Sequence, residues 1–212
     1  MLAMTRSRSG SQFHLWGTFF LSMLALASPW GCAGPHAARS EKSLAQLSLW
    51  TKVQVQPRGD TTWRVLAAQD AISSGDRFNV TVASKQPAYL YVALSPSDQS
   101  LAVLVPSPGE LPPQLVPGSA VYAPGPGEDQ SWTLDERTGA EHLYVIGAAR
   151  PLSPAELTAV ISAVSPTPLS TDREPPPIAD SKNRTGQQGH FFFAAAANPD
   201  GVAVIHVAFQ HK

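Results

Sequence analysis

Hydrophobic and polar residues alternate with a period of two along much of the chain from Leu47 onward. Such alternation places every second side chain on one face of a β-strand. It is clear in residues 50–56 and 78–83, and the turn residues 58–60 predict that the first of these strands pairs with residues 62–66 in a hairpin. Most of the chain after Leu47 is therefore expected to form strands.

Four further segments extend the strand pattern. Residues 88–94 and 101–105 are continuous apolar runs, which is typical of strands that are buried on both faces. Residues 131–134 and 141–149 resume the alternating pattern. These segments predict the centre of the fold.

Proline marks two loops. Residues 106–130 contain seven prolines, which leaves room for at most a short strand near residues 119–122, because proline has no amide hydrogen to donate to a neighbouring strand. Residues 165–189 contain five prolines and few apolar residues, which predicts a long loop.

A single helix is predicted after residue 153. Ser153, Pro154 and Glu156 have the order of a capping box, with serine at the N-cap, proline at the first helical position and glutamate three residues after the cap. Leu157 and Ile161 then begin an apolar stripe at helical spacing, and the helix is expected to end before residue 166.

The C-terminal segment is expected to form a second hairpin. Phe191 to Phe193 and Val202 to Phe209 flank Asn198-Pro199-Asp200-Gly201, which has the composition of a type I turn. In that register Phe193 would face Val207, and the last strand would belong to the core. In sum, residues 47–212 are predicted to form a mainly β domain, an antiparallel β-sandwich of about nine short strands with one short helix.

The first residues have the character of an export signal. Residues 1–40 contain no Asp or Glu, and Arg6 and Arg8 precede an apolar stretch at residues 13–27. This stretch is shorter than the roughly 20 residues that a membrane-spanning helix needs. Residues 1–31 are therefore interpreted as a signal peptide.

Two cleavage sites compete. Ala25-Leu26-Ala27 suits the general signal peptidase, which would release a secreted or periplasmic protein. Gly31-Cys32 resembles the end of a bacterial lipoprotein signal, and this resemblance implies that Cys32 is acylated and becomes the first residue. Residues 32–46 would then be a lipidated N-terminus and flexible tether. Ala33 after the cysteine favours the outer membrane over the inner one, again by this resemblance.

Composition excludes several classes of protein. The formal charge of −1 offers no basic surface for nucleic acid, so no nucleic-acid partner is expected. A single cysteine excludes an internal disulfide and a four-cysteine zinc site. The same cysteine is the most informative residue of the chain, because it follows a charged and apolar leader.

Short motifs from Gly75 to Pro151 carry a second resemblance. They are Gly75-Asp76-Arg77-Phe78, Tyr89-Leu90-Tyr91-Val92, Leu104-Val105-Pro106, Gly118 before Tyr122-Ala123-Pro124, Gly139 to Ile146, and Arg150-Pro151-Leu152. This stretch resembles a bacterial domain family of unknown function that occurs on envelope lipoproteins, on caspase-like peptidases and beside serine/threonine kinases. The resemblance implies a β-rich accessory or sensing module, and it brings no catalytic residue with it.

Candidate chemistry is sparse. None of the six histidines has the spacing of a metal site, and His206 and His211, five residues apart, are expected on opposite faces of a strand, so no metal or cofactor is predicted. No G-x-S-x-G motif occurs, and no catalytic residue is assigned. A hydrolase would instead require a serine or carboxylate to converge with His142, His190 or His206.

Aromatic residues are the remaining candidates for a binding surface. Trp63, Tyr91, Tyr122 and Trp132 either pack in the core or form a recognition surface for a protein or glycan. The leading hypothesis is a non-enzymatic lipoprotein, held in the outer membrane by its lipid anchor, that binds an envelope protein or serves as an accessory module. The alternative is a secreted or anchored hydrolase that acts on cell-envelope polymers.

Overall fold

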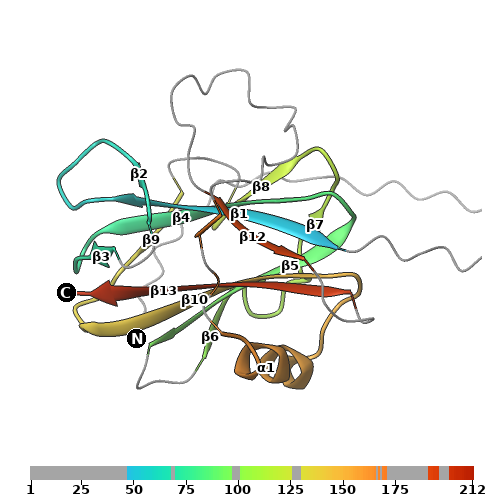
Figure 1. Cartoon of the computed structure of the whole chain (residues 1–212). Helices are drawn as coiled ribbons and strands as arrows, with labels where there is room; N and C mark the ends of the chain where they lie inside the picture. Colours follow the sequence, from blue (N-terminus) through green and yellow to red (C-terminus); the bar gives the residue numbers. More distant parts are fainter. Residues whose placement is uncertain are drawn as a thin grey trace, which may run out of the picture. The chain divides into compact units, whose positions relative to one another are not determined.

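The computed structural model of the chain describes residues 47–67, 70–96, 101–125, 130–165, 167, 169–170, 191–195 and 201–212. In this part of the chain, two β-sheets pack face to face and one helix lies beside them, as in a β-sandwich (Figure 1). The predicted signal peptide, Cys32, its tether and most of the 165–189 loop lie outside the described residues. The predicted fold class is confirmed.

Sheet A has the order β11-β12-β1-β4-β8, with β2 paired to β1 and β9 paired to β4. The predicted first hairpin is confirmed, because β1 pairs with β2 and places Gln54 opposite Val65. The strands of this sheet are β1 (Ser48–Gln56), β2 (Arg64–Val65), β4 (Arg77–Ser84), β8 (Ala120–Ala123), β9 (Trp132–Thr133), β11 (Leu169–Ser170) and β12 (Phe191–Ala195).

Sheet B has the order β3-β13-β10-β5-β6, with β7 paired to β5. Its strands are β3 (Ala71–Ile72), β5 (Ala88–Pro96), β6 (Ala102–Val105), β7 (Gln114–Leu115), β10 (Gly139–Ala148) and β13 (Val202–His211). The strand pairs are antiparallel, except that β3 runs parallel to the end of β13. The sandwich is thus antiparallel apart from one short edge pair.

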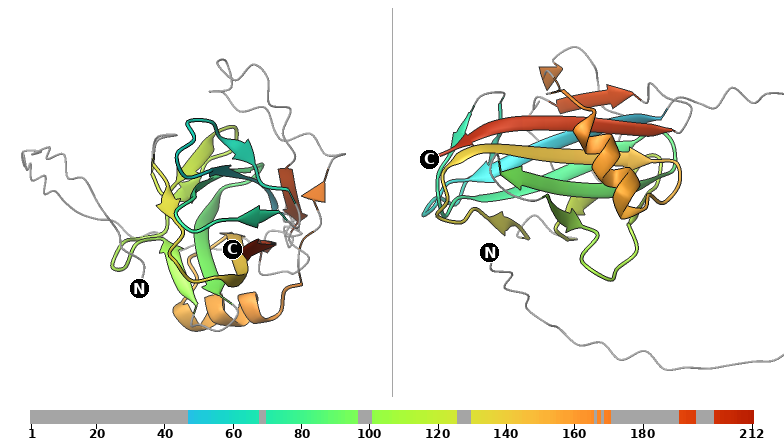
Figure 2. Two further views of the ribbon diagram at one scale, coloured as in Figure 1. Left: turned by 90° about the vertical axis from the view of Figure 1, so that its left-hand side faces the viewer. Right: turned by 90° about the horizontal axis from the view of Figure 1, so that it is seen from below.

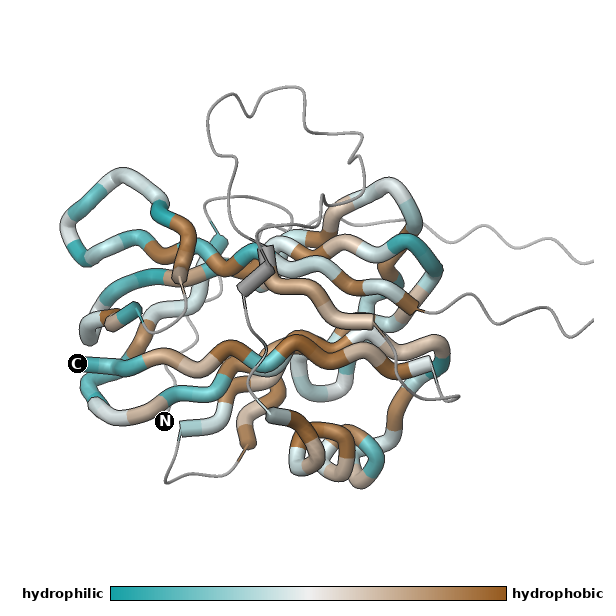
Figure 3. The backbone as a smooth tube through the Cα atoms, in the orientation of Figure 1, coloured by the Kyte–Doolittle hydropathy of each residue, from teal (hydrophilic) through white to brown (hydrophobic). Residues whose placement is uncertain are grey.

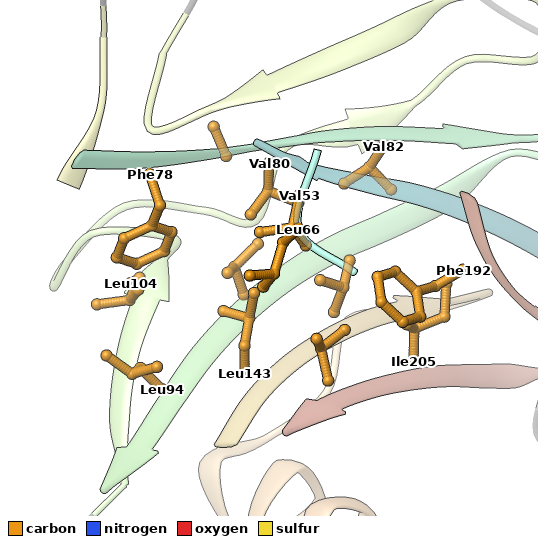
Figure 4. Close-up of a cluster of buried hydrophobic side chains, with 14 of the residues drawn as sticks. Val53, Leu66, Phe78, Val80, Val82, Leu94, Leu104, Leu143, Phe192 and Ile205 are labelled. Carbon is orange, nitrogen blue, oxygen red and sulfur yellow. The ribbon is translucent and has the colours of Figure 1, made fainter. Parts of the chain in front are cut away.

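The core lies between the two sheets, where alternate side chains of facing strands meet. Phe78, Val80 and Val82 of β4 point from sheet A toward Leu143 of β10 and Ile205 of β13 in sheet B (Figure 4). Hydrophobic residues run through the middle of the long strands, and hydrophilic residues gather at the turns between them (Figure 3). The period of two in the sequence therefore reports directly which side chains are buried.

The other face of sheet B is covered by helix α1 (Pro154–Ser162), as Figure 2 shows. Ser153 and Glu156 form the predicted capping box, in which each side chain bonds the backbone amide of the other residue. Leu157 and Ile161 are buried against the outward residues of β5 and β10. Sheet B is consequently apolar on both faces, which explains the continuous apolar runs in its strands.

The predicted C-terminal hairpin is wrong. β12 pairs with β1 in sheet A, where Phe193 lies opposite Trp50, whereas β13 pairs with β10 in sheet B, where Val207 lies opposite Leu143. The chain therefore crosses from one sheet to the other between these strands, and residues 198–200 of the predicted turn lie outside the described residues. The prediction that the last strand belongs to the core is confirmed, because Ile205 is fully buried.

The described residues contain thirteen strands rather than about nine. The additional ones, such as β3 and β7, are two residues long and are too short to show a period. β7 lies within the proline-rich stretch, where Leu115 is fully buried opposite Ala88. In the part of the chain that is described, no helix combines the length and apolar character needed to cross a membrane.

Candidate functional site

Two of the four aromatic residues predicted for a binding surface lie in the interior. Tyr91 is 4% exposed, and its hydroxyl accepts a hydrogen bond from the Leu152 amide. Trp132 is 6% exposed and packs its ring 5.2 Å from that of Phe78. Both residues therefore serve packing, as the alternative interpretation of the sequence held, and neither can form a surface.

Trp63 and Tyr122 are half-buried and lie at the outer face of sheet A. Tyr122 of β8 is opposite Thr81 of β4. The neighbours of Thr81 on the same strand, Val80 and Val82, point into the core, so Tyr122 and Thr81 point outward. Trp63 precedes β2 and reaches the same face through its contact with Arg77.

Arg77 connects these elements. Its guanidinium carbon lies 5.8 Å from the centre of the Trp63 ring, within the range of a cation–π interaction. Its Nε donates to the Ser131 hydroxyl at 2.7 Å, and its Nη1 donates to the Gln56 side chain at 3.1 Å. The hydrogen bonds that Arg77 donates to β1 and to the residue before β9 thus hold the guanidinium against the indole.

We call Trp63, Arg77, Gln54, Gln56 and Tyr122 the aromatic–cation surface. All five residues are half-buried. Since Val53 and Val55 point inward, the glutamines of β1 point outward beside the arginine of β4. The indole, the amide of Gln56 and the guanidinium lie together, and the phenol of Tyr122 lies further along the same face, opposite Thr81. Such groups can stack on a sugar or side chain and hydrogen-bond its polar groups.

The outward positions of β1, β4 and β8 carry no carboxylate. Their ionisable side chains are Lys52 and Arg77, with Tyr122, and Lys85 at the end of β4 places its ammonium 5.4 Å from the Trp50 ring. The charged side chains at these outward positions are thus basic, and of the two on the strands Arg77 is half-buried whereas Lys52 is only 6% exposed. A partner that presents negative charge would be favoured here.

A histidine pair occupies the opposite side of the molecule, on the outer face of sheet B. His142 Nδ1 lies 2.9 Å from His206 Nε2, and the Tyr144 ring stacks on His206 with a centroid distance of 4.5 Å. Burial, followed by the charge of His142, lowers the pKa of His206, and burial raises the pKa of Tyr144. The described residues contain no group of three or more His, Cys, Asp or Glu side chains that could hold a metal ion.

A third cluster joins Ser74, His211 and Glu141 at one end of the sandwich. Ser74 Oγ lies 3.1 Å from His211 Nε2, and His211 Nδ1 lies 3.6 Å from Glu141 Oε1. The sequence predicted that His206 and His211 point to opposite faces, and this is confirmed, because His211 shares the inward face of β13 with Phe209. No local spacing could reveal the cluster, since 137 positions separate the serine from the histidine.

Comparison with protein families finds a domain of unknown function (DUF4384) at residues 72–151. The match runs from within β3 to the residues after β10, and it corresponds to the stretch in which the sequence motifs predicted such a resemblance. No curated protein and no solved structure matches the chain.

Proposed function

We propose that the protein is an exported lipoprotein of the cell envelope whose β-sandwich binds a partner through the aromatic–cation surface. The observation that carries the proposal is the arrangement of Trp63, Arg77 and Tyr122 on one face of sheet A, where Arg77 is fixed by Ser131 and Gln56. Binding of this kind requires no chemistry from the protein itself, in agreement with the expectation that it is a binding or accessory module.

The proposed anchor is the acylated Cys32. An arginine-bearing leader, a short apolar stretch and Gly31-Cys32 support it. Each buried acyl methylene contributes about 0.8 kcal/mol, and more than one acyl chain is needed for durable attachment. Such a lipoprotein would hold the sandwich at the surface of the outer membrane.

The proposed partner is an envelope protein with an acidic patch. Aromatic and arginine side chains dominate binding energy at protein interfaces, and Arg77 among outward positions of β1, β4 and β8 that carry no carboxylate would favour negative charge. Arg77 contributes twice, because it supplies charge and also orients the indole of Trp63.

Affinity capture from detergent-solubilised membranes tests the binding surface. The wild-type chain should retain a defined partner, identified by mass spectrometry, and Arg77→Ala and Trp63→Ala should each lower its recovery about tenfold or more. Arg137→Ala is the matched control, because this exposed arginine makes only a 4.0 Å ion pair with Asp135 and lies outside the surface. Equal recovery with the Arg77→Ala and Arg137→Ala variants would contradict the proposed surface.

The anchor has a separate test. Cys32→Ser should move the protein from the membrane fraction to the soluble fraction, since it removes the atom that is acylated. If the Cys32→Ser protein still sediments with membranes, the lipid anchor is wrong, whatever the outcome of the capture experiment.

A further inference from the structure

Ser74, His211 and Glu141 have the order of a nucleophile, a base and an acid. The serine hydroxyl is within hydrogen-bond distance of one imidazole nitrogen, and the other nitrogen faces the carboxylate at 3.6 Å. The side chains of His211 and Glu141 are 0% and 6% exposed, whereas Ser74 is half-buried in the turn after β3. The serine is thus the member of the cluster that a ligand can reach.

The backbone holds this serine in place. The Ser74 amide donates to the carbonyl of Lys212, and the Lys212 amide donates to the carbonyl of Ile72. The turn is braced further by Asp76, which is 5% exposed and accepts bonds from the amides of Ser73 and Arg58. A nucleophile on such a support keeps its geometry when a substrate approaches.

The stem of Arg58 crosses the turn at Gly75, the residue after the serine. Gly75 has a φ of +84°, and a β-carbon at this position would lie only 2.9 Å from Arg58 Cδ, so the absence of a side chain lets the stem of Arg58 cross the turn. The amides of Ser74 and Gly75 donate to the carbonyls of Lys212 and Leu134. Arg58 is exposed and is the group that we assign to the negative charge of a reacting oxygen.

From this geometry we propose that the cluster is an esterase site, in which Ser74 attacks the carbonyl carbon of a carboxylic ester. The Ser74 proton passes to His211 Nε2 as the bond from Oγ to carbon forms. The bond from carbon to the alcohol oxygen then breaks, and the alcohol leaves with the proton from His211. Water repeats the sequence on the acyl-serine, releases the carboxylic acid and restores the Ser74 hydroxyl.

Each residue has a distinct role. Ser74 is the nucleophile, His211 transfers the proton and Arg58 faces the oxyanion, so these three are the catalytic residues. Glu141 touches no reacting atom and is assigned as a positioning residue, because its carboxylate, on the neighbouring strand β10, lies 3.6 Å from His211 Nδ1 and would attract the imidazolium that forms when His211 takes the proton. The substrate class that fits is an ester on a negatively charged molecule, because Arg58 would attract it.

Labelling with a fluorophosphonate tests the nucleophile in the full chain. The probe should phosphonylate Ser74, as located by peptide mass spectrometry, and the chain should hydrolyse 4-nitrophenyl acetate. Ser74→Ala should abolish both signals, and His211→Asn should lower the labelling rate about 10³-fold. Ser73→Ala is the matched control, because Ser73 is the exposed neighbour in the same turn, and it should label like the wild type.

Two further variants test the supporting roles. Arg58→Gln should slow labelling about 10²-fold, which is the effect of removing one oxyanion donor. Glu141→Gln should slow labelling with no matching fall in the thermal midpoint, and Glu141→Asp should restore part of the rate. A purely structural carboxylate would change the midpoint instead.

Wild-type protein that is not labelled at Ser74, or that is labelled no more than the Ser74→Ala variant, would overturn the esterase site. Because Ser74→Ala removes only a hydroxyl from a half-buried turn, a folding defect cannot mimic that result. The aromatic–cation surface is tested by partner recovery and shares no residue with the esterase cluster, so either proposal can fail while the other stands.

Discussion

The stretch that matches the domain family and the segments that flank it both supply long strands to the sandwich, but only the matched stretch resembles a known family. Residues 72–151 supply β4 to sheet A and β5 and β10 to sheet B. β4 then pairs with β1, which precedes the stretch, and β10 pairs with β13, which follows it. The matched stretch is therefore not a closed unit in this chain.

The pairing of β10 shows what the flanks add. Strand β13 runs along the whole of β10, on the side that β5 leaves free. It carries Ile205, Val207 and Phe209 into the core, each at most 3% exposed. Without β13, the inner strand β10 would become an exposed apolar edge of the kind that promotes aggregation.

Deleting residues 202–212 should have the largest effect on the fold. The expected result is an insoluble product, because the deletion removes a central strand together with its buried side chains. Soluble yield and circular dichroism measure the outcome. A soluble truncation that still unfolds cooperatively would show that the fold does not need its last strand, and would refute the core assignment of β13.

Single core substitutions in the matched stretch and in its flank should have a smaller effect. Ile205→Ala in the flank and Leu143→Ala in the matched stretch should each lower the free energy of unfolding by about 2–5 kcal/mol, since both side chains are fully buried in the same core. Val116→Ala, at a position 55% exposed, is the control and should have little effect. Chemical denaturation measures all three.

A marked inequality between the two core variants would change the interpretation. If Ile205→Ala cost much less than Leu143→Ala, the flank would be a peripheral addition to the family domain rather than part of its core. Comparable costs would instead mean that the fold boundary of this protein lies well outside residues 72–151.

The sequence predicted the structural features that depend on residues close together along the chain. The period of two located the long strands, and Ser153 with Glu156 located the helix, because a capping box is made within one turn. The prediction of a C-terminal hairpin was wrong because Phe192 and Phe193 precede a turn motif in the sequence but pair with β1 in sheet A, whereas β13 lies in sheet B. Sheet membership is decided by tertiary packing, which a turn motif cannot report.

The candidate sites were harder to predict for the same reason. Aromatic character predicts Trp63 and Tyr122, whereas Arg77, which fixes the indole, belongs only to a motif of the family resemblance. Ser74 and Glu141 meet His211 only because β3 and β10 both border β13. These three residues meet because of the order of the strands in sheet B, and the hydrophobic period of a strand does not reveal that order.

The smallest expected effect lies where the matched stretch and its flank meet on the outer face of sheet B, at His142 and His206. Burial lowers the pKa of His206 in the folded protein, so below the ordinary value of 6.5 the unfolded chain binds a proton more readily than the folded one. Stability should therefore be complete above pH 6.5 and should decline as the pH falls below it. Replacing His206 with Gln should reduce that decline.

Thermal midpoints measured between about pH 7.5 and about pH 5.5 give the result, because histidines titrate in this window and the His206→Gln variant separates His206 from the others. Glu156 affects the stability only at lower pH. Hydrogen bonds from Arg150 and from Ser153 hold the pKa of its carboxyl group at about 2, so its contribution to stability is lost only as the pH falls below the ordinary value of 4.5. His142→Gln should give an intermediate decline, since it removes the neighbouring charge but not the burial of His206. If wild type and His206→Gln lose the same stability on acidification, the pair does not couple the flank to the family stretch, and another group governs the acid response.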